Sequence, residues 1–136
     1  RPLLLGQPND FECLVLAAEA NATLGDLQQA FVSYEAAARL QPNNADVWVA
    51  LGNTAQQLGR MQDAQNSYQK AVTVDSSRAL AYYNLATVYH AQDQWDQAVD
   101  AYQQALTRDA SLYEAHFGLG SVLEQKQQWQ NALKQY

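Results

Sequence analysis

The chain has 136 residues, of which 48% are hydrophobic, and its formal net charge is −6. The hydrophobic fraction suffices for a packed core and argues against a disordered chain, whereas the acidic balance argues against nucleic-acid binding through phosphate contacts. The single cysteine excludes a disulfide within the chain and a metal site built from several cysteines, and no apolar run is long enough to span a membrane.

The sequence repeats with a period of 34 residues. A residue position shared by successive repeats is called a column below. One column holds only tyrosine, two hold alanine and a fourth holds leucine: Tyr34, Tyr68, Tyr102 and Tyr136; Ala30, Ala64, Ala98 and Ala132; Ala37, Ala71 and Ala105; Leu51, Leu85 and Leu119. Few prolines and glycines, with abundant alanine and glutamine, favour an all-helical protein.

We expect residues 1–10 to be the tail of a preceding repeat or a leader. Units then follow at 11–44, 45–78 and 79–112, and a truncated fourth unit occupies 113–136. In each unit the apolar spacing predicts a helix of about 14 residues, a short turn and a second helix of similar length. Gly25 and Gly59 occupy the turn position, where a left-handed backbone ends the first helix. Asp93 and Gln127 fill it later, and Asp tolerates that backbone better than Gln does.

These residues resemble a known repeat. In the second unit the resemblance to the tetratricopeptide repeat, a helix–turn–helix motif, rests on Trp48, Leu51, Gly52, Gly59, Ala64, Tyr68 and Ala71. It covers essentially the whole chain, identifies no individual protein, and implies an all-α fold: a right-handed α-solenoid of antiparallel helix pairs. It further implies that a column of small residues on the first helices faces the alanine column of the second helices: Ala18, Gly52, Ala86 and Gly120 against Ala30, Ala64, Ala98 and Ala132.

The sequence predicts no catalytic residue, no cofactor and no metal site. Cys13, His90 and His116 lie in different units, so a reactive Cys–His pair is not expected, and Cys13 is interpreted as a small half-buried apolar residue. His116 stands in the column of Trp48 and is expected to pack there. We also expect Trp95 and Trp129, at the start of second helices, to belong to the core.

The resemblance implies that the first helices line a concave groove in which peptides bind. The predicted peptide-binding groove consists of Glu12, Val15, Glu19, Asp46, Val49, Asn53, Gln56, Tyr83, Asn84, Thr87, His90, Phe117, Ser121 and Glu124. An alternative for its apolar members is that they pack against neighbouring helices. The first thirteen positions of the four units contain five acids and no lysine or arginine: Glu12, Glu19, Asp46, Glu114 and Glu124. This favours a partner that carries Lys or Arg and apolar anchors, the alternative being an acidic surface without a partner.

The function expected is therefore that of a protein-interaction scaffold for a protein or peptide ligand. Tetratricopeptide arrays that hold chaperone C-termini use a carboxylate clamp of lysine, arginine and asparagine, and only Asn84 stands at a suitable position here, so a peptide ending in Glu-Glu-Val-Asp should bind negligibly. Two alternatives stay open: the substrate-recruiting arm of a larger enzyme such as a glycosyltransferase, and an oligomerising segment of a bacterial assembly or secretion protein. Trp129, Leu133 and Tyr136 lack the partner that a further helix would supply, which suggests self-association through the C-terminal end.

Overall fold

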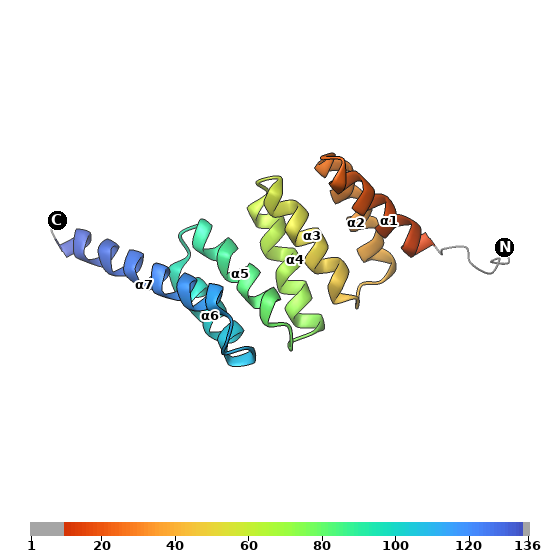
Figure 1. The fold of residues 1–136 in the computed structure, drawn as a ribbon. Helices are drawn as coiled ribbons and strands as arrows, with labels where there is room; N and C mark the ends of the chain where they lie inside the picture. Colours follow the sequence, from red (N-terminus) through yellow and green to blue (C-terminus); the bar gives the residue numbers. More distant parts are fainter. Residues whose placement is uncertain (1–9, 135–136) are drawn as a thin grey trace. The chain divides into compact units, whose positions relative to one another are not determined.

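The computed structural model describes residues 10–134. Over these residues it contains seven α-helices and no strand, which confirms the all-α fold (Figure 1). The helices are α1 (Asp10–Thr23), α2 (Leu27–Leu40), α3 (Ala45–Gln57), α4 (Met61–Val74), α5 (Ala79–Ala91), α6 (Trp95–Arg108) and α7 (Tyr113–Lys134). The leader predicted for residues 1–10 lies outside the described residues except for Asp10, and so does Tyr136.

The helices form two compact units. Helices α1 to α4 belong to the first unit, which ends at Val74, and α5 to α7 belong to the second, which begins at Asp75. In the first unit α1 packs against α2 and α3 against α4, and α2 also contacts α3. In the second unit α6 packs against both α5 and α7. The first unit therefore consists of two helix pairs joined by short turns, and the second unit of one such pair and α7.

The alanine columns lie in the core of each unit. Ala30, Ala64 and Ala98 are completely buried, and the second alanine column is buried equally well: Ala37, Ala71 and Ala105. Side chains this small let two helices approach closely, and the large buried tyrosines fill the space beside them. Ala132, the fourth member of the first column, is exposed, contrary to its predicted place opposite Gly120.

In the small-residue column, Gly52 lies against the ring of Tyr68. A Cβ atom added to Gly52 would lie 2.6 Å from Cε1 of Tyr68, and the two next nearest atoms belong to the same ring. Tyr68, rather than the predicted Ala64, thus supplies the nearest atoms at Gly52. Gly52 lacks a side chain because the Tyr68 ring takes its place. At Gly120 the same added atom would meet nothing within 4 Å.

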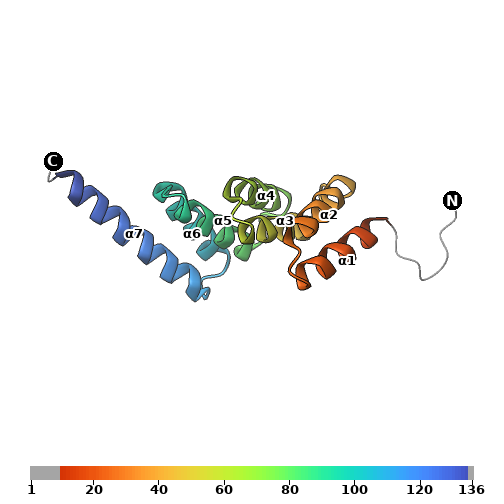
Figure 2. The same ribbon diagram turned by 90° about the horizontal axis from the view of Figure 1, so that it is seen from above.

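The left-handed backbone predicted at the turn position is confirmed in the first three repeats. Gly25 and Gly59 have φ angles of +86° and +78°, and Asp93 takes +59°, the left-handed backbone that ends a helix. The turn predicted at Gln127 is wrong, because α7 runs without interruption from Tyr113 to Lys134 (Figure 2). Glutamine is a good helix former and carries a steric penalty in the left-handed region, so the backbone at this position stays helical.

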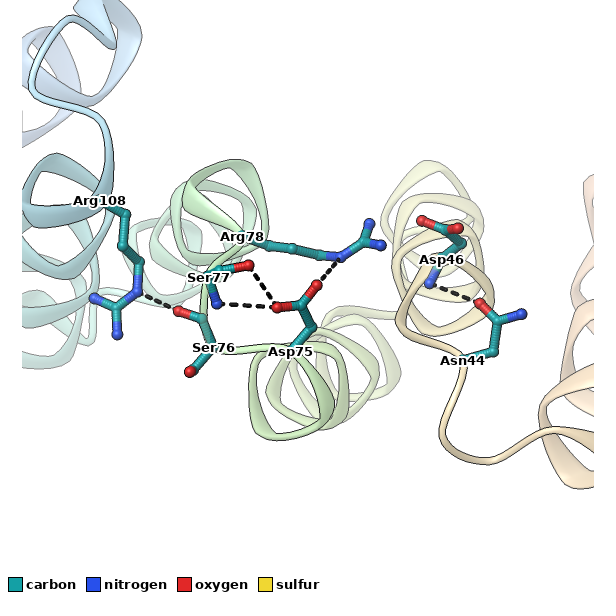
Figure 3. A network of polar contacts seen from close by, with 7 residues as sticks. All are labelled: Asn44, Asp46, Asp75, Ser76, Ser77, Arg78 and Arg108. Carbon is teal, nitrogen blue, oxygen red and sulfur yellow. Dashed lines mark hydrogen bonds and ion pairs between the residues drawn. The ribbon is translucent and has the colours of Figure 1, made fainter.

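A second turn, between one repeat and the next, is closed by side-chain bonds. In the second unit Asp75 accepts hydrogen bonds from the backbone N–H and the hydroxyl of Ser77, at 3.1 and 2.6 Å, and pairs with Arg78 (Figure 3). Asp109 and Ser111 repeat this arrangement one period later, at 3.0 and 2.6 Å. These bonds lower the pKa of both carboxyl groups.

The corresponding turn of the first unit uses a different residue. There the side chain of Asn44 accepts a hydrogen bond from the backbone N–H of Asp46 at 3.1 Å and so caps α3 (Figure 3). In the second unit Arg108 donates to the carbonyl oxygen of Ser76, and its guanidinium lies 4.2 Å from the ring centre of Tyr82. The side chain of the last residue of α6 thereby fixes the chain that leads into α5.

Candidate functional site

The tyrosines of the first three repeats, Tyr34, Tyr68 and Tyr102, lie close to predicted groove residues. In the first unit the hydroxyl of Tyr68 lies 2.5 Å from Oδ1 of Asn53 and 3.1 Å from Oε1 of Gln56. Burial raises the pKa of Tyr68, so the phenol keeps its proton and donates it. One hydroxyl hydrogen is shared between two amide oxygens, and this fixes both amides on the same face of α3.

Tyr34 stands in the same relation to α1. Burial raises its pKa, and the nearby carboxylate of Glu19, which is exposed, raises it further. Glu19 and Asn53 occupy the same position of successive 34-residue repeats. In both repeats of the first unit, therefore, the tyrosine of the second helix lies beneath the ninth residue of the first helix.

In the second unit Tyr102 supports aromatic groove residues. Its ring centre lies 6.0 Å from that of Tyr83 and 6.5 Å from that of His90. Burial, followed by the effect of Tyr83, raises the pKa of Tyr102 to about 12. Helix α7 comes equally close to this ring, because a Cβ atom on Gly118 would lie 2.5 Å from Cε1 of Tyr102. Tyr102 is thus enclosed by α5 and α7.

A side-chain bond links the two first helices of the second unit. Nε2 of His90 lies 2.7 Å from Oε1 of Gln125, so the end of α5 is tied to the middle of α7. On α5, the hydroxyl of Thr87 donates to the backbone carbonyl of Asn84 at 2.6 Å, and both side chains are half-buried. The structure therefore brings the predicted residues of α5 close to α7.

The exposed fractions of the remaining predicted groove residues show which of them pack and which of them face solvent. Val15 and Val49 are half-buried, and Val15 packs against a cluster that contains Ala37 and Val47, which favours the packing alternative for this residue. Phe117, in the same column, is 81% exposed. The predicted acids are all exposed, at Glu12, Glu19, Asp46 and Glu124, and Ser121 is half-buried.

Three packing expectations are wrong. Cys13 is exposed rather than half-buried. Trp129 is 52% exposed, although its ring lies 5.9 Å from that of Trp95, which is half-buried. His116 is also exposed, yet its Nε2 lies 2.9 Å from the carbonyl oxygen of Ala110.

His116 nevertheless reproduces a contact that Trp48 makes in the same column. Nε1 of Trp48 donates at 2.7 Å to the carbonyl oxygen of Pro42, which, like Ala110 for His116, lies six residues earlier. The smaller ring of His116 thus reaches the same kind of acceptor that Trp48 reaches.

Sequence reasoning missed part of the exposed apolar surface of the second unit. Tyr113 at the start of α7 is 81% exposed and Leu80 on α5 is 62% exposed. Tyr113 is the first residue of α7 and Leu80 the second residue of α5. Among residues 10–134 no three His, Cys, Asp or Glu side chains gather as metal ligands, and none of the helices there is long and apolar enough to cross a membrane.

Comparison with known families decides the assignment. Models of the tetratricopeptide repeat match residues 43–111, 22–59 and 89–136. The chain belongs to the tetratricopeptide repeat family. Its fold is the α-solenoid of that family, as the sequence predicted, and a search of curated proteins returns no match.

Solved structures with this fold include a peptide-bound tetratricopeptide domain and an enzyme. Two crystal structures of MamA match with TM-scores of 0.83, at 28% and 25% identity, over 86% and 94% of this chain. The chain spans 64% and 75% of the length of those two structures. The first tetratricopeptide domain of Spaghetti (RPAP3), bound to an HSP90 peptide, matches with a TM-score of 0.79 at 17% identity, over 85% of this chain and 91% of that one. An O-GlcNAc transferase of Thermobaculum terrenum matches with a TM-score of 0.72 at 23% identity, over 86% of this chain and 23% of that one.

Proposed function

We propose that this tetratricopeptide protein is a non-enzymatic protein-interaction scaffold, and that its second unit binds a peptide carrying Lys or Arg together with an apolar anchor. The observation that carries the proposal is Phe117, a large aromatic side chain that is 81% exposed in the groove-lining column. Ser121 lies four residues after Phe117, and Glu124 lies three residues after Ser121. With this spacing the three side chains share one face of α7. An exposed aromatic ring beside carboxylates suits a peptide with one apolar and one basic residue.

The distribution of charge supports a basic partner. Helices α1, α3 and α5 contain no lysine or arginine. The first lysine of α7, Lys126, is paired with Asp96 at 2.6 Å. The carboxylates of Glu114 and Glu124 are thus the exposed charges nearest to Phe117 along α7. Such charges contribute more to the rate of encounter and to specificity than to affinity, and salt screens them.

The peptide-bound neighbour suggests the mode of binding but not the ligand. The RPAP3 domain holds an HSP90 peptide that ends in Glu-Glu-Val-Asp. A ligand of that kind needs cations on the first helices, and in this chain those helices offer carboxylates. We therefore expect an acidic peptide of this type to bind negligibly.

Fluorescence anisotropy with a short labelled peptide that carries lysine, arginine and leucine tests the proposal. We expect the dissociation constant to rise severalfold as NaCl increases from about 0.05 to about 0.3 M, because the Debye length shortens. Phe117→Ala should weaken binding by about tenfold, the loss typical of an aromatic anchor. Glu124→Gln should reduce the salt dependence.

Val32→Ala is the matched control, because Val32 is also exposed but lies on α2, outside the groove column. This variant should bind like the unmodified chain. Absent binding, binding that salt does not change, or an equal effect of the two alanine variants would contradict the proposal.

Of the alternatives, only self-association is supported by a feature of the structure. The resemblance to the O-GlcNAc transferase concerns the fold, so a role as a recruiting arm is not proposed. Trp129 and Leu133 are 52% and 55% exposed on the second half of α7. We propose that this half of α7 mediates self-association, separately from peptide binding.

A further inference from the structure

Helix α1 carries a stripe of exposed apolar side chains on a side that faces away from α2. All members of this stripe, called the α1 stripe below, are exposed: Cys13, Ala17, Ala20 and Leu24. At about 100° per residue, their spacing of three or four residues places them within about 60° of one another around the helix. Leu24 follows the last residue of α1, and its backbone N–H still donates to the carbonyl oxygen of Ala20 at 3.1 Å. The packed side of α1 carries Ala18, which is completely buried.

The same columns are buried in repeats where a second helix covers them. On α3 the columns of the stripe hold Val47, Leu51 and Thr54, and each of the three is 4% exposed. Helix α2 packs against this helix and shares a buried cluster with Val47. On α7, which packs against α6, Ala115 and Val122 stand in the same columns and are completely buried. The α1 stripe therefore occupies the position of a surface that receives a packed helix in later repeats, and the structure of residues 10–134 leaves it exposed.

Small side chains form the middle of the stripe. Ala17 and Ala20 stand there, in the columns where α3 carries the larger side chains of Leu51 and Thr54. Leu24, at the C-terminal end of the stripe, is 82% exposed. Closely packed helices set the large side chains of one helix against the small side chains of the other. A helix that packs on the α1 stripe therefore needs a bulky apolar side chain opposite the two alanines.

A cavity continues the stripe at its N-terminal end. It has a volume of about 530 Å³ and lies between the start of α1 and the end of α2. Its lining residues are Asp10, Cys13, Leu14, Ala36, Arg39 and Leu40. Cys13 thus belongs to both the cavity and the stripe. A helix that lies along the stripe can place a further apolar side chain in this cavity.

The charged residues of α1 are all carboxylates. Asp10, Glu12 and Glu19 are exposed, and α1 contains no lysine or arginine. By their positions along the helix, Asp10 and Glu12 lie on either side of the stripe. A second copy of the chain would pair α1 with another acidic helix, whereas Lys or Arg on a different helix would complement these carboxylates. Charge therefore favours a basic partner over self-association at this surface.

We propose that the α1 stripe binds an amphipathic helix of a partner protein, one with a bulky apolar residue at its centre and Lys or Arg on both flanks. At about 1.5 Å per residue, the stripe spans about 16 Å along the axis from Cys13 to Leu24, which corresponds to about three turns of the partner helix. The docked helix takes the place on α1 that α2 takes on α3. The stripe belongs to the first unit, so it is a second binding surface beside the peptide site proposed for the second unit.

Alkylation of Cys13 tests the proposal, because this residue is the chain's single cysteine and lies within the stripe. The probe is a synthetic peptide of about 18 residues, long enough to form a helix, with leucines along one face and lysine and arginine beside them. Labelling of the thiol by iodoacetamide is followed by mass spectrometry. At a peptide concentration of about four times the dissociation constant, the labelling rate should fall about fivefold. A peptide of the same composition, with its leucines scattered around the helix, is the control and should leave the rate unchanged.

A pair of variants locates the peptide on the stripe. Ala20→Gln fills the middle of the stripe with a longer polar side chain and should weaken protection of Cys13 by about tenfold in peptide concentration. Because Ala20 is exposed and glutamine is a good helix former, the variant should keep its fold. Ala91→Gln makes the same change at an exposed alanine of α5 and should leave the protection intact.

Several results would overturn this binding surface. One is a labelling rate that the amphipathic peptide does not change, and another is equal protection by the peptide with scattered leucines. Equal protection in Ala20→Gln and Ala91→Gln would place the peptide elsewhere on the chain. Slow labelling of the unmodified chain without peptide would show that a second copy, or another part of the chain, already covers the stripe.

Discussion

Gly52 and Gly120 occupy the same position of two repeats, and alanine at each separates helix propensity from packing. Both lie inside helices, α3 and α7, where alanine is favoured over glycine by about 1 kcal/mol. An added Cβ atom at Gly120 would meet nothing within 4 Å, so Gly120→Ala should gain this full amount in the monomer. Its melting temperature should rise by roughly 4 °C.

At Gly52 the same gain is opposed by Tyr68. The added Cβ atom would lie 2.6, 2.8 and 2.9 Å from three ring carbons, well inside van der Waals contact. The ring is completely buried and its hydroxyl is bonded to Asn53, so it has little room to move. Overpacking of this kind costs about 1–3 kcal/mol. Because Ala86 occupies this column in the third repeat, we expect an overpacking cost in the lower part of that range. After the gain in helix propensity is subtracted, the net effect should lie between zero and about 1 kcal/mol of destabilisation.

The decisive quantity is the difference between the two variants. Gly120→Ala should be more stable than Gly52→Ala by at least about 1 kcal/mol, a value that cancels the propensity common to both. Urea unfolding followed by circular dichroism, at a concentration low enough to keep the chain monomeric, measures it. Equal free energies of unfolding would refute the claim that the second helix confines Gly52 and leaves Gly120 open.

Three further predictions concern the core and the titrating groups. Ala64→Leu should destabilise the chain by about 3 kcal/mol, since Ala64 is completely buried, and an unchanged thermal melt would contradict the close approach of α3 and α4. The raised pKa of Tyr102, about 12, implies stability that is complete below pH 10 and declines as the pH rises from 10 to 12, and Tyr102→Phe should make unfolding less dependent on pH there. The carboxyl group of Asp109 should titrate below its usual 3.8 in an NMR experiment, and Ser111→Ala should move the midpoint back up; an unchanged midpoint would contradict the bonds from Ser111.

The repeat period predicts most of the fold, because the backbone preferences of the residues and the packing of their side chains favour the same structure in the first three repeats. At the turn column, glycine and aspartate both permit positive φ, and the helices end there as predicted. The fourth unit keeps the packing residues of a second helix but has Gln127 at the turn. Repetition alone predicts a turn at that place, whereas the backbone preference of one residue predicts a helix, and in this structure the helix prevails.

The sequence predicts which candidate residues share a helix face, but it does not predict their tertiary contacts. Spacing along the first helices predicts which side chains share a face, and this requires no tertiary information. The contact of Tyr68 with Asn53 and the bond of His90 to Gln125 join residues far apart in sequence, and no local pattern encodes them. His116 shows the opposite case. Histidine replaces the tryptophan of the second repeat there, yet its ring makes a similar contact with a backbone carbonyl oxygen.

The tyrosines beneath the groove make stability and recognition inseparable in this protein. Tyr68 is at once the completely buried aromatic residue of α4 and the group that orients Asn53 and Gln56. A ligand that binds the amides of Asn53 and Gln56 would therefore also stabilise the packing of α4 against α3. It would do so through the phenol of Tyr68, without contacting that ring. A substitution of Tyr68 would therefore change both the packing of α4 against α3 and the orientation of two predicted groove side chains.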